Sequence, residues 1–175
     1  PHPPSPIPHP PSPTRKADIM EIVNRPAPPT GLRRRLWRLP ILLYRLRLGR
    51  LLGGRVMLLT HTGRVSGLPR RAVIEVVQHD EQGYVAASGF GVRADWYRNV
   101  MTTSEVVLQV GGKTLRATAA PISADDGAEL MARYAPRHPV AARRLCQIMG
   151  FAVDGSEADY REVGRRIPFV RFTPA

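Results

Sequence analysis

The stretch VMLLTHTGRVSGLPRRAVIEVVQH, residues 56 to 79, contains the strongest local structural signal in the chain. Its two ends, Val56 to Thr62 and Arg71 to His79, are rich in apolar and β-branched residues, which favours strands. The segment between them holds two glycines and Pro69, residue types that favour turns. The stretch therefore predicts a strand, a tight turn and a returning strand.

Four further segments show strand-like composition: Tyr84 to Ser88, Val106 to Val110, Lys113 to Ala120 and Ile167 to Phe172. The spacer Asp80 to Gly83 offers a glycine for positive φ and predicts a hairpin. Gly111 and Gly112 form a two-residue loop suited to a primed turn, which predicts a second hairpin.

Helices are expected between these strands. Ala94 to Thr102 has the pattern of a short helix. Ser123 followed by Asp126 resembles a capping box and predicts a helix through Tyr134, and Ser156 with Asp159 predicts another through Gly164. A further helix and a turn are expected before Ser156. Strands first, inserted helices and a returning last strand predict an α+β barrel of about six strands.

Composition limits the kind of protein this is. A length of 175 residues and an apolar share of 43% fit one folded domain with extensions. The single cysteine, Cys146, excludes an internal disulfide framework and is expected to be a buried thiol. Phosphate-loop, dinucleotide-binding, HExxH and CxxC motifs are absent, and the histidines lack ligand-like spacing, so no metal site is expected.

The chain divides into three predicted parts. Residues 1 to 19 are rich in proline and are expected to form a disordered tail. Residues 20 to 54 form a basic segment, in which Leu32 to Leu52 has the spacing of an amphipathic helix. Nine arginines lie in residues 20 to 55 against one acid, Glu21. Residues 55 to 175 form the barrel domain.

The basic segment has two interpretations that can hold together. Its helix either lies over the barrel or docks on an anionic membrane surface. No secretory signal is evident, and its apolar runs are far shorter than the ~20 residues that span a membrane. We expect a cytoplasmic protein that can sit on the inner face of the plasma membrane. Nucleic acid is disfavoured as a partner because no recognition motif or aromatic stacking strip accompanies the arginines.

The turn after Thr62 has the composition of a phosphate site. Its glycines let backbone N–H groups approach an anion, and its hydroxyls donate hydrogen bonds. Arg64, Arg70 and Arg71 carry guanidinium groups, which bind phosphate in a bidentate way. The same residues could also form an ordinary surface hairpin with solvated arginines, and composition does not separate the two.

A second informative stretch is SGFGVRADWYRN, residues 88 to 99. Ser88 ends a predicted strand, and Trp96 and Asn99 lie three residues apart on the next helix. Residues at that spacing share a helical face, so an indole and an amide there can line a planar ring and bind its edge.

These two stretches, in this order and separation, resemble the deazaflavin-dependent nitroreductase family of actinobacteria, whose members use the hydride carrier coenzyme F₄₂₀. The resemblance runs from about Arg55 to Pro174. Its main parts are T-x-T-G-R-x-S-G-x-P-R, matched by Thr60 to Arg70, and a serine strand end followed by W-Y-x-N, matched by Ser88 and Trp96 to Asn99. The resemblance implies a split β-barrel related to flavin-mononucleotide-binding oxidoreductases.

The resemblance also assigns roles to particular residues. The cofactor phosphate and the neighbouring tail would be held by Arg64, Ser66, Gly67 and Arg70. The deazaflavin ring would be lined by Ser88, Gly89, Trp96 and Asn99. Val65 stands where many members carry a lysine.

Substrate and catalytic residues are less clearly marked. Family members that reduce nitroimidazoles have a tyrosine-rich segment before the last strand, and here that segment retains Tyr134 but not the later tyrosines. Tyr134, His138 and Tyr160 are the candidates for substrate contact. No catalytic residue is assigned, because a reduced deazaflavin itself delivers hydride and the protein mainly orients the reactants.

Two functional hypotheses follow. The first is an oxidoreductase that transfers hydride from reduced coenzyme F₄₂₀ to an organic acceptor such as a quinone or a nitro compound, with flavin mononucleotide (FMN) as second choice of cofactor. The second is a non-catalytic carrier of the same fold that binds a lipid, fatty acid, haem or flavin. Because related barrels often dimerise, the resemblance also implies a homodimer.

Overall fold

The computed structural model describes residues 54–175. The predicted proline-rich tail and nearly all of the predicted basic amphipathic helix lie outside the described residues. The domain division made from the sequence stays a prediction.

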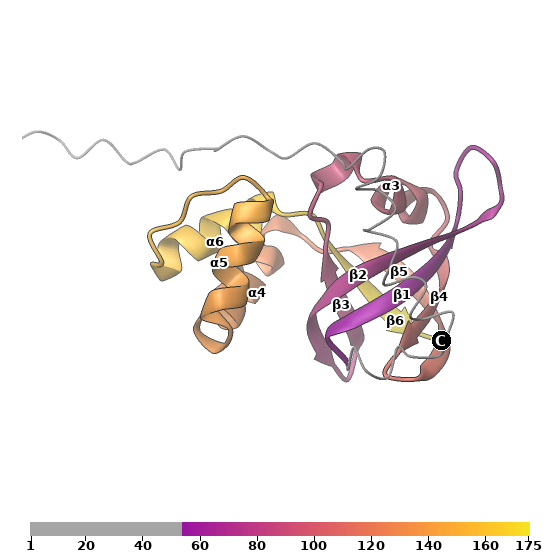
Figure 1. The fold of residues 1–175 in the computed structure, drawn as a ribbon, viewed down its shortest axis with the longest axis horizontal. Coiled ribbons are helices and arrows are strands. Elements are labelled where there is room, and N and C mark those ends of the chain that lie inside the picture. Colours follow the sequence, from indigo (N-terminus) through magenta and orange to yellow (C-terminus); the bar gives the residue numbers. More distant parts are fainter. Residues whose placement is uncertain (1–53) are drawn as a thin grey trace, which may run out of the picture.

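Six antiparallel strands form a closed barrel (Figure 1). Their order around the barrel is β1-β2-β3-β6-β5-β4, and β1 pairs with β4 to close it. The strands are β1 (Val56–Thr62), β2 (Pro69–Asp80), β3 (Gly83–Ala87), β4 (Glu105–Val110), β5 (Lys113–Pro121) and β6 (Phe169–Pro174). The predicted α+β barrel is therefore confirmed.

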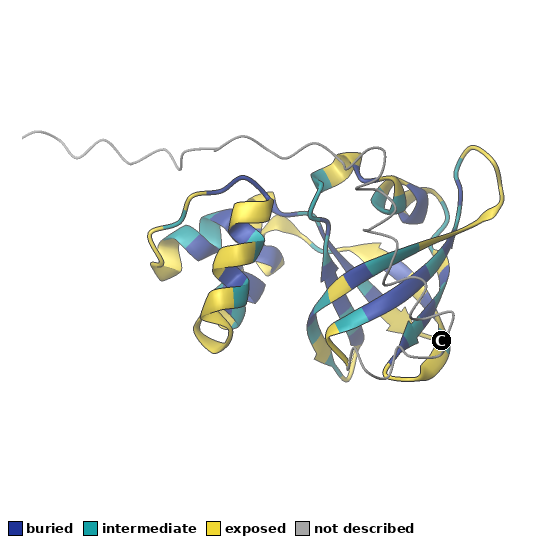
Figure 2. Ribbon diagram, viewed as in Figure 1, coloured by how far each residue is buried: buried dark blue, intermediate teal, exposed yellow. Residues whose placement is uncertain are grey.

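The barrel interior is filled by alternate residues of each strand, as the two-residue period of strands requires. Met57 and Leu59 of β1 are fully buried, as are Leu108 of β4 and Phe172 of β6. These side chains belong to one apolar cluster. Burial alternates clearly along β4, whereas β1 has three consecutive buried residues because its other face is covered as well (Figure 2).

Both predicted hairpin turns use glycine at positive φ. Gly83 has a φ of 122°, and Gly111 and Gly112 have φ values of 55° and 85°. Two successive positive φ values are typical of the primed turn that matches strand twist. The strand bounds differ slightly from those predicted: β2 begins at Pro69 rather than Arg71, and β6 begins at Phe169 because Ile167 ends the preceding helix.

One short helix covers an end of the barrel. A 3₁₀ turn, η2 (Gly91–Arg93), leads into α3 (Asp95–Thr102), which confirms the helix predicted there. Val100 of α3 is buried in the barrel cluster, and Trp96 and Tyr97 pack against it. The barrel is therefore closed by apolar side chains of α3 at the end where β1 leaves and β2 begins.

A three-helix lobe is inserted between β5 and β6. It comprises α4 (Ala124–Arg137), α5 (Pro139–Ile148) and α6 (Glu157–Arg166). The core of the lobe includes Val77 of β2 and Val85 of β3, so the helices pack on the outer face of these strands (Figure 1). Cys146 lies in this core, and burial raises the pKa of its thiol to about 11, as expected for a structural cysteine.

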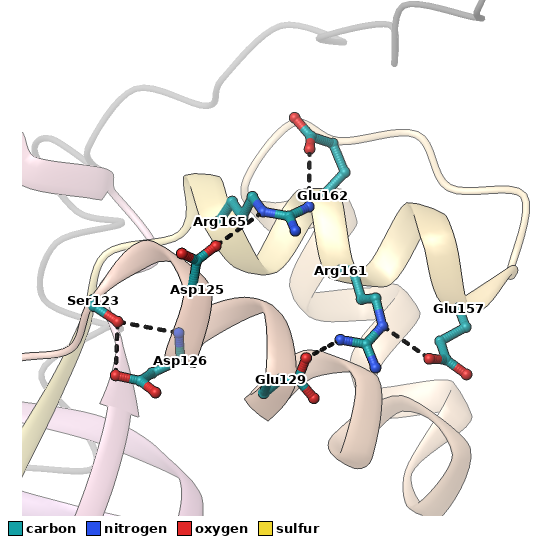
Figure 3. Close-up of polar contacts among 8 residues, drawn as sticks. All are labelled: Ser123, Asp125, Asp126, Glu129, Glu157, Arg161, Glu162 and Arg165. Carbon is teal, nitrogen blue, oxygen red and sulfur yellow. Dashed lines mark hydrogen bonds and ion pairs between the residues drawn. The ribbon is translucent and has the colours of Figure 1, made fainter.

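Ser123 and Ser156 cap α4 and α6, as predicted. The Ser123 hydroxyl accepts a hydrogen bond from the Asp126 backbone N–H, and Ser156 accepts one from Asp159 (Figure 3 shows the first). The first helix runs three residues further than predicted, to Arg137, and contains Pro136. The expected additional helix is α5.

Helices α4 and α6 cross at a glycine pair. A Cβ atom on Gly164 would lie 2.4 Å from the Gly127 carbonyl oxygen, so the two backbones touch. Around this crossing, Arg161 pairs with Glu129 and Glu157, and Arg165 pairs with Asp125 and Glu162 (Figure 3).

Candidate cofactor site

The turn between β1 and β2 is a tight loop that extends beyond the barrel (Figure 1). Gly63 N–H donates to the Leu68 carbonyl at 2.9 Å, and Gly67 N–H donates to the Gly63 carbonyl at 2.8 Å. Gly67 has a φ of 64°, a conformation that favours glycine. A Cβ atom on Gly63 would lie 2.8 Å from the Ser66 hydroxyl oxygen and 3.3 Å from the Leu68 carbonyl oxygen, so the loop leaves little room for a side chain there.

Arg64 is fixed to α3. Its backbone N–H donates to Asn99 Oδ1 at 3.1 Å, and its Nη1 donates to the same oxygen at 3.0 Å. Nη1 also pairs with Asp95 Oδ1 at 3.1 Å. The Asp95 side chain is 81% exposed, whereas that of Arg64 is 25% exposed. The structure thus brings Arg64 and Asn99, from the two motif stretches, into direct contact.

Arg70 and Arg71 are both exposed at the start of β2. Arg70 Nη2 donates to the Ser66 hydroxyl at 3.3 Å. Within residues 54–175 neither guanidinium has a carboxylate partner. Arg64 on the glycine-containing turn and Arg70 and Arg71 just after it provide three cationic groups, two of them without a carboxylate partner within residues 54–175, and such a set fits an anionic ligand.

His61 lies beneath this loop, and the sequence analysis did not single it out. Its ring is only 5% exposed, and Nδ1 lies 3.2 Å from Asn99 Nδ2. Burial lowers the pKa of the imidazole, Arg70 adds to the lowering, and the Thr62 backbone and Asp95 oppose it. The strand period could have revealed this residue, because His61 has the same parity as the inward-facing Met57 and Leu59.

Ser88 and Gly89 lie where β3 ends. Ser88 is fully buried, and its hydroxyl donates to the Gly91 carbonyl at 2.7 Å. Its backbone N–H donates to the Pro168 carbonyl at 2.9 Å. A Cβ atom on Gly89 would lie 3.8 Å from Ile148 of α5, so this segment lies between the barrel and the lobe.

Trp96 and Asn99 share the face of α3 that is directed at the barrel. The Trp96 ring lies 6.5 Å from the Phe172 ring and meets Tyr97 edge-on at 6.0 Å. Asn99 is 5% exposed and is engaged with Arg64 and His61. The shared face was predicted, and the structure adds that it contacts protein.

The substrate candidates all lie in the helical lobe. Tyr134 and His138 have ring centroids 5.0 Å apart, and His138 is exposed. Burial raises the pKa of Tyr134, Glu75 of β2 adds to this, and Arg55 opposes it. Tyr160 is 6% exposed and belongs to the lobe core, which makes it a packing residue.

No helix within residues 54–175 is long and apolar enough to cross a membrane. In the same range, no three His, Cys, Asp or Glu side chains gather as metal ligands do.

Several solved structures are similar to this chain. A protein of unknown function from Agrobacterium tumefaciens is similar at 20% identity and a TM-score of 0.50, over 75% of this chain and 55% of that one. An F₄₂₀H₂-dependent reductase has 22% identity and a TM-score of 0.45, over 67% and 93% of the two chains. The haem storage protein HutZ from Vibrio cholerae has 14% identity and a TM-score of 0.49, over 75% and 89%.

A search of curated protein sequences gave no match. A family model does match, over residues 32–145, which is well over half of the chain and includes both motif stretches. The matched region covers the loop, α3, the end of β3 and most of α4 and α5. The chain therefore belongs to the F420H(2)-dependent quinone reductase family and is an F₄₂₀-dependent reductase.

Proposed function

We propose that the loop between β1 and β2 holds the anionic tail of reduced coenzyme F₄₂₀ through Arg64, Arg70, Ser66 and Gly67. Arg70 and Arg71 have no carboxylate partner within residues 54–175, which is the observation that carries the proposal. Like charges crowded on one turn repel one another, and a bound phosphate relieves that repulsion with charge-assisted hydrogen bonds.

The deazaflavin ring is proposed to lie beside Ser88, Gly89 and Trp96, at the same end of the barrel as the loop. Ser88 acts there through the backbone turn that its hydroxyl fixes, because that hydroxyl already donates to the Gly91 carbonyl. Gly89 lacks a side chain where a ring would approach the backbone. Asn99 contributes by holding Arg64 rather than by reaching the ring.

The bound reduced cofactor supplies hydride to an acceptor, and a quinone is the acceptor that we propose, with nitro compounds as the second class. The protein binds the tail, orients the ring and excludes water from one side. Tyr134 and His138 are the proposed acceptor contacts, since both lie on the lobe. Neither needs to act as a nucleophile.

Spectral titration tests the cofactor assignment. Purified protein should shift the deazaflavin absorbance on binding, and FMN should bind more weakly. The double variant Arg64→Ala with Arg70→Ala should weaken deazaflavin binding by at least about 100-fold, because each charge-assisted hydrogen bond contributes roughly 1.5 to 3 kcal/mol.

The matched control is Arg165→Ala with Arg166→Ala, which removes the same charge from ion-paired arginines of α6. It should bind like the wild type. Equal loss in both double variants would show only a net-charge effect and would contradict the proposal. No spectral change, together with a co-purified lipid, haem or flavin, would favour the carrier alternative.

We also propose that the basic segment, residues 20 to 54, docks the enzyme on an anionic membrane surface where a quinone is accessible. The support is its charge of nine arginines against one acid in residues 20 to 55. Removing residues 1 to 52 should release the protein from anionic vesicles, and salt should weaken binding of the full chain. Unchanged vesicle binding after the truncation would contradict this.

A further inference from the structure

Three residues from different elements form a continuous hydrogen-bonded chain at the covered end of the barrel. His61 of β1 contacts Asn99 of α3, and Asn99 contacts Arg64 on the loop. His61 and Asn99 are both 5% exposed. The chain therefore leads from the barrel interior to an arginine of the candidate anion site.

The direction of each hydrogen bond in this chain is fixed by Arg64. A backbone N–H and a guanidinium can only donate, so the Asn99 atom that faces them must be the carbonyl oxygen. The Asn99 amide NH₂ then faces His61 Nδ1, 3.2 Å away. His61 Nδ1 must accept that hydrogen bond, and the imidazole is neutral with its proton on Nε2.

We propose that neutral His61 is a positioning residue for the anionic tail of the cofactor, and that it acts through Asn99 to hold Arg64 and its loop in the binding geometry. This inference rests on the proposed role of Arg64 in cofactor binding. It goes further by assigning a function to a buried residue that touches neither cofactor nor acceptor.

Protonation of His61 would reverse the donor and acceptor roles along this series of hydrogen bonds. Nδ1–H becomes a donor and then faces the donor NH₂ of Asn99, so the amide must rotate to present its oxygen to His61. After that rotation the NH₂ group faces the two donors of Arg64. Both hydrogen bonds that hold Arg64 to Asn99 are then lost, and within residues 54–175 the Arg64 side chain is held to α3 only by its pair with the exposed Asp95 carboxylate.

The groups around His61 define the pH at which this occurs. Asp95 on α3 favours the charged imidazole, while Arg70, the cross-strand neighbour of His61, disfavours it. Arg64, held by Asn99, is a further positive charge on this network. Burial is the largest influence and favours the neutral form, whereas the hydrogen bond with the Thr62 backbone favours the charged form. The pKa of His61 lies below its ordinary value of 6.5, so His61 is neutral at pH 7 and its hydrogen bonds reverse only on acidification.

Two substitutions of His61 separate its role as a hydrogen-bond acceptor from the effect of its protonation. His61→Asn retains an acceptor near the Nδ1 position and cannot be protonated in this range. It should bind coenzyme F₄₂₀ within about twofold of the wild type at pH 7.5 and show no weakening at pH 5. His61→Leu removes the acceptor, and it should bind about tenfold more weakly at both pH values, the effect of losing one to two hydrogen bonds.

A deazaflavin that lacks the phosphate tail is the matched ligand. It should bind all three proteins equally, because the positioning effect acts on the tail alone. Wild type that binds the two ligands equally would refute the anion clamp itself. The other outcome is that the wild type binds the ligand with the tail more tightly, and both His61 variants show the same preference as the wild type at every pH. That outcome would refute only the role of His61.

The cofactor-free protein gives an independent readout by NMR. Hydrogen exchange of the Arg64 backbone amide, corrected for the intrinsic pH dependence, should accelerate about tenfold in His61→Leu at pH 7.5 and in wild type at pH 5. In His61→Asn it should stay slow at both pH values. A thermal melt confirms that each variant is folded, and an Arg64 amide that is equally protected in all of them would overturn the inference.

Discussion

Two groups of arginines in this protein have opposite surroundings. On α6, each of Arg161, Arg165 and Arg166 pairs with at least one carboxylate of α4 or α6. On the loop between β1 and β2, Arg64 has one exposed carboxylate partner, and Arg70 and Arg71 at the start of β2 have none within residues 54–175. The arginines of α6 are therefore compensated by carboxylates of the protein, whereas Arg70 and Arg71 are not within residues 54–175.

The difference separates structure from binding. Exposed ion pairs contribute little individually, and those of α6 mainly set how two helices meet over their glycine contact. Arg70 and Arg71 are neighbouring positive charges that have no carboxylate partner in the described part of the chain, so they repel each other. Such an arrangement is expected at a site whose missing negative charge is supplied by a ligand.

The largest expected effect is a loss of stability in the helical lobe. Gly164→Ala places a Cβ atom 2.4 Å from the Gly127 carbonyl oxygen and 2.7 Å from the Ala128 Cα atom, both backbone atoms. We expect a loss of about 2 to 3 kcal/mol in the free energy of unfolding, measured in urea, because overpacking outweighs the gain in helix propensity.

Ala158→Gly on the exposed side of α6 is the control, and it should cost only the propensity difference of about 1 kcal/mol. A Gly164→Ala protein as stable as the wild type would show that the helices separate easily and that the ion pairs, rather than the glycines, fix the crossing.

The next effect lies at the loop. Asn99→Ala removes the acceptor of two Arg64 donors and leaves buried His61 without its partner. We expect a stability loss of about 1 to 3 kcal/mol, and about tenfold weaker binding of coenzyme F₄₂₀. Thr102→Ala on the same helix removes an exposed hydrogen bond to Arg98 and should change neither quantity appreciably. Loss of stability with unchanged affinity would show that Arg64 does not need its tether.

A smaller effect, a gain in cofactor affinity, is expected when Arg64 loses its carboxylate partner Asp95. Asp95→Asn removes the only carboxylate that pairs with Arg64 within residues 54–175, so a bound anion no longer competes with it. Affinity for the cofactor should rise about threefold at low salt, the scale of an exposed ion pair. Asp125→Asn, which removes one of the two carboxylate partners of Arg165 in the lobe, changes the net charge equally and should leave affinity unaltered. Tighter binding in both variants would indicate long-range electrostatics instead.

The smallest effect concerns the paired arginines. Arg161→Gln removes the contacts of Arg161 with Glu129 and Glu157, all at exposed positions. The melting temperature should fall slightly at low salt and match that of the wild type at about 1 M salt, where the screening length is near 3 Å. Cofactor affinity should not change. A large drop in melting temperature at high salt would mean that the contacts of Arg161 stabilise the fold by more than exposed ion pairs do.

Much of the fold was predictable because its signals are local. The glycines at 83, 111 and 112 marked both hairpins, and each takes the positive φ that a turn requires. Ser123 and Ser156 marked two helix starts, and both hydroxyls accept the expected capping hydrogen bond. In the site, the motif residues Arg64 and Asn99 were singled out, and they do meet.

Other features depend on non-local pairing. Between Val76 and Gln78 the register with β3 shifts, which places His79 opposite Tyr84, where the rings stack at 4.2 Å. The glycine contact between α4 and α6 joins residues 127 and 164, and the sequence around each glycine does not predict its contact with the other. The partner of Asn99 was predicted to be a flat ring edge, whereas its amide is engaged with Arg64 and His61.

The sequence by itself determined the strands, turns, caps and the motif arginines, because hydrophobic period, backbone freedom and capping act over a few residues. Only the tertiary structure decided which arginines pair with a carboxylate and which do not. An ion pair is set by the distance between side chains from elements far apart in the chain, and Arg64 meets Asp95 only because α3 folds over the end of the barrel.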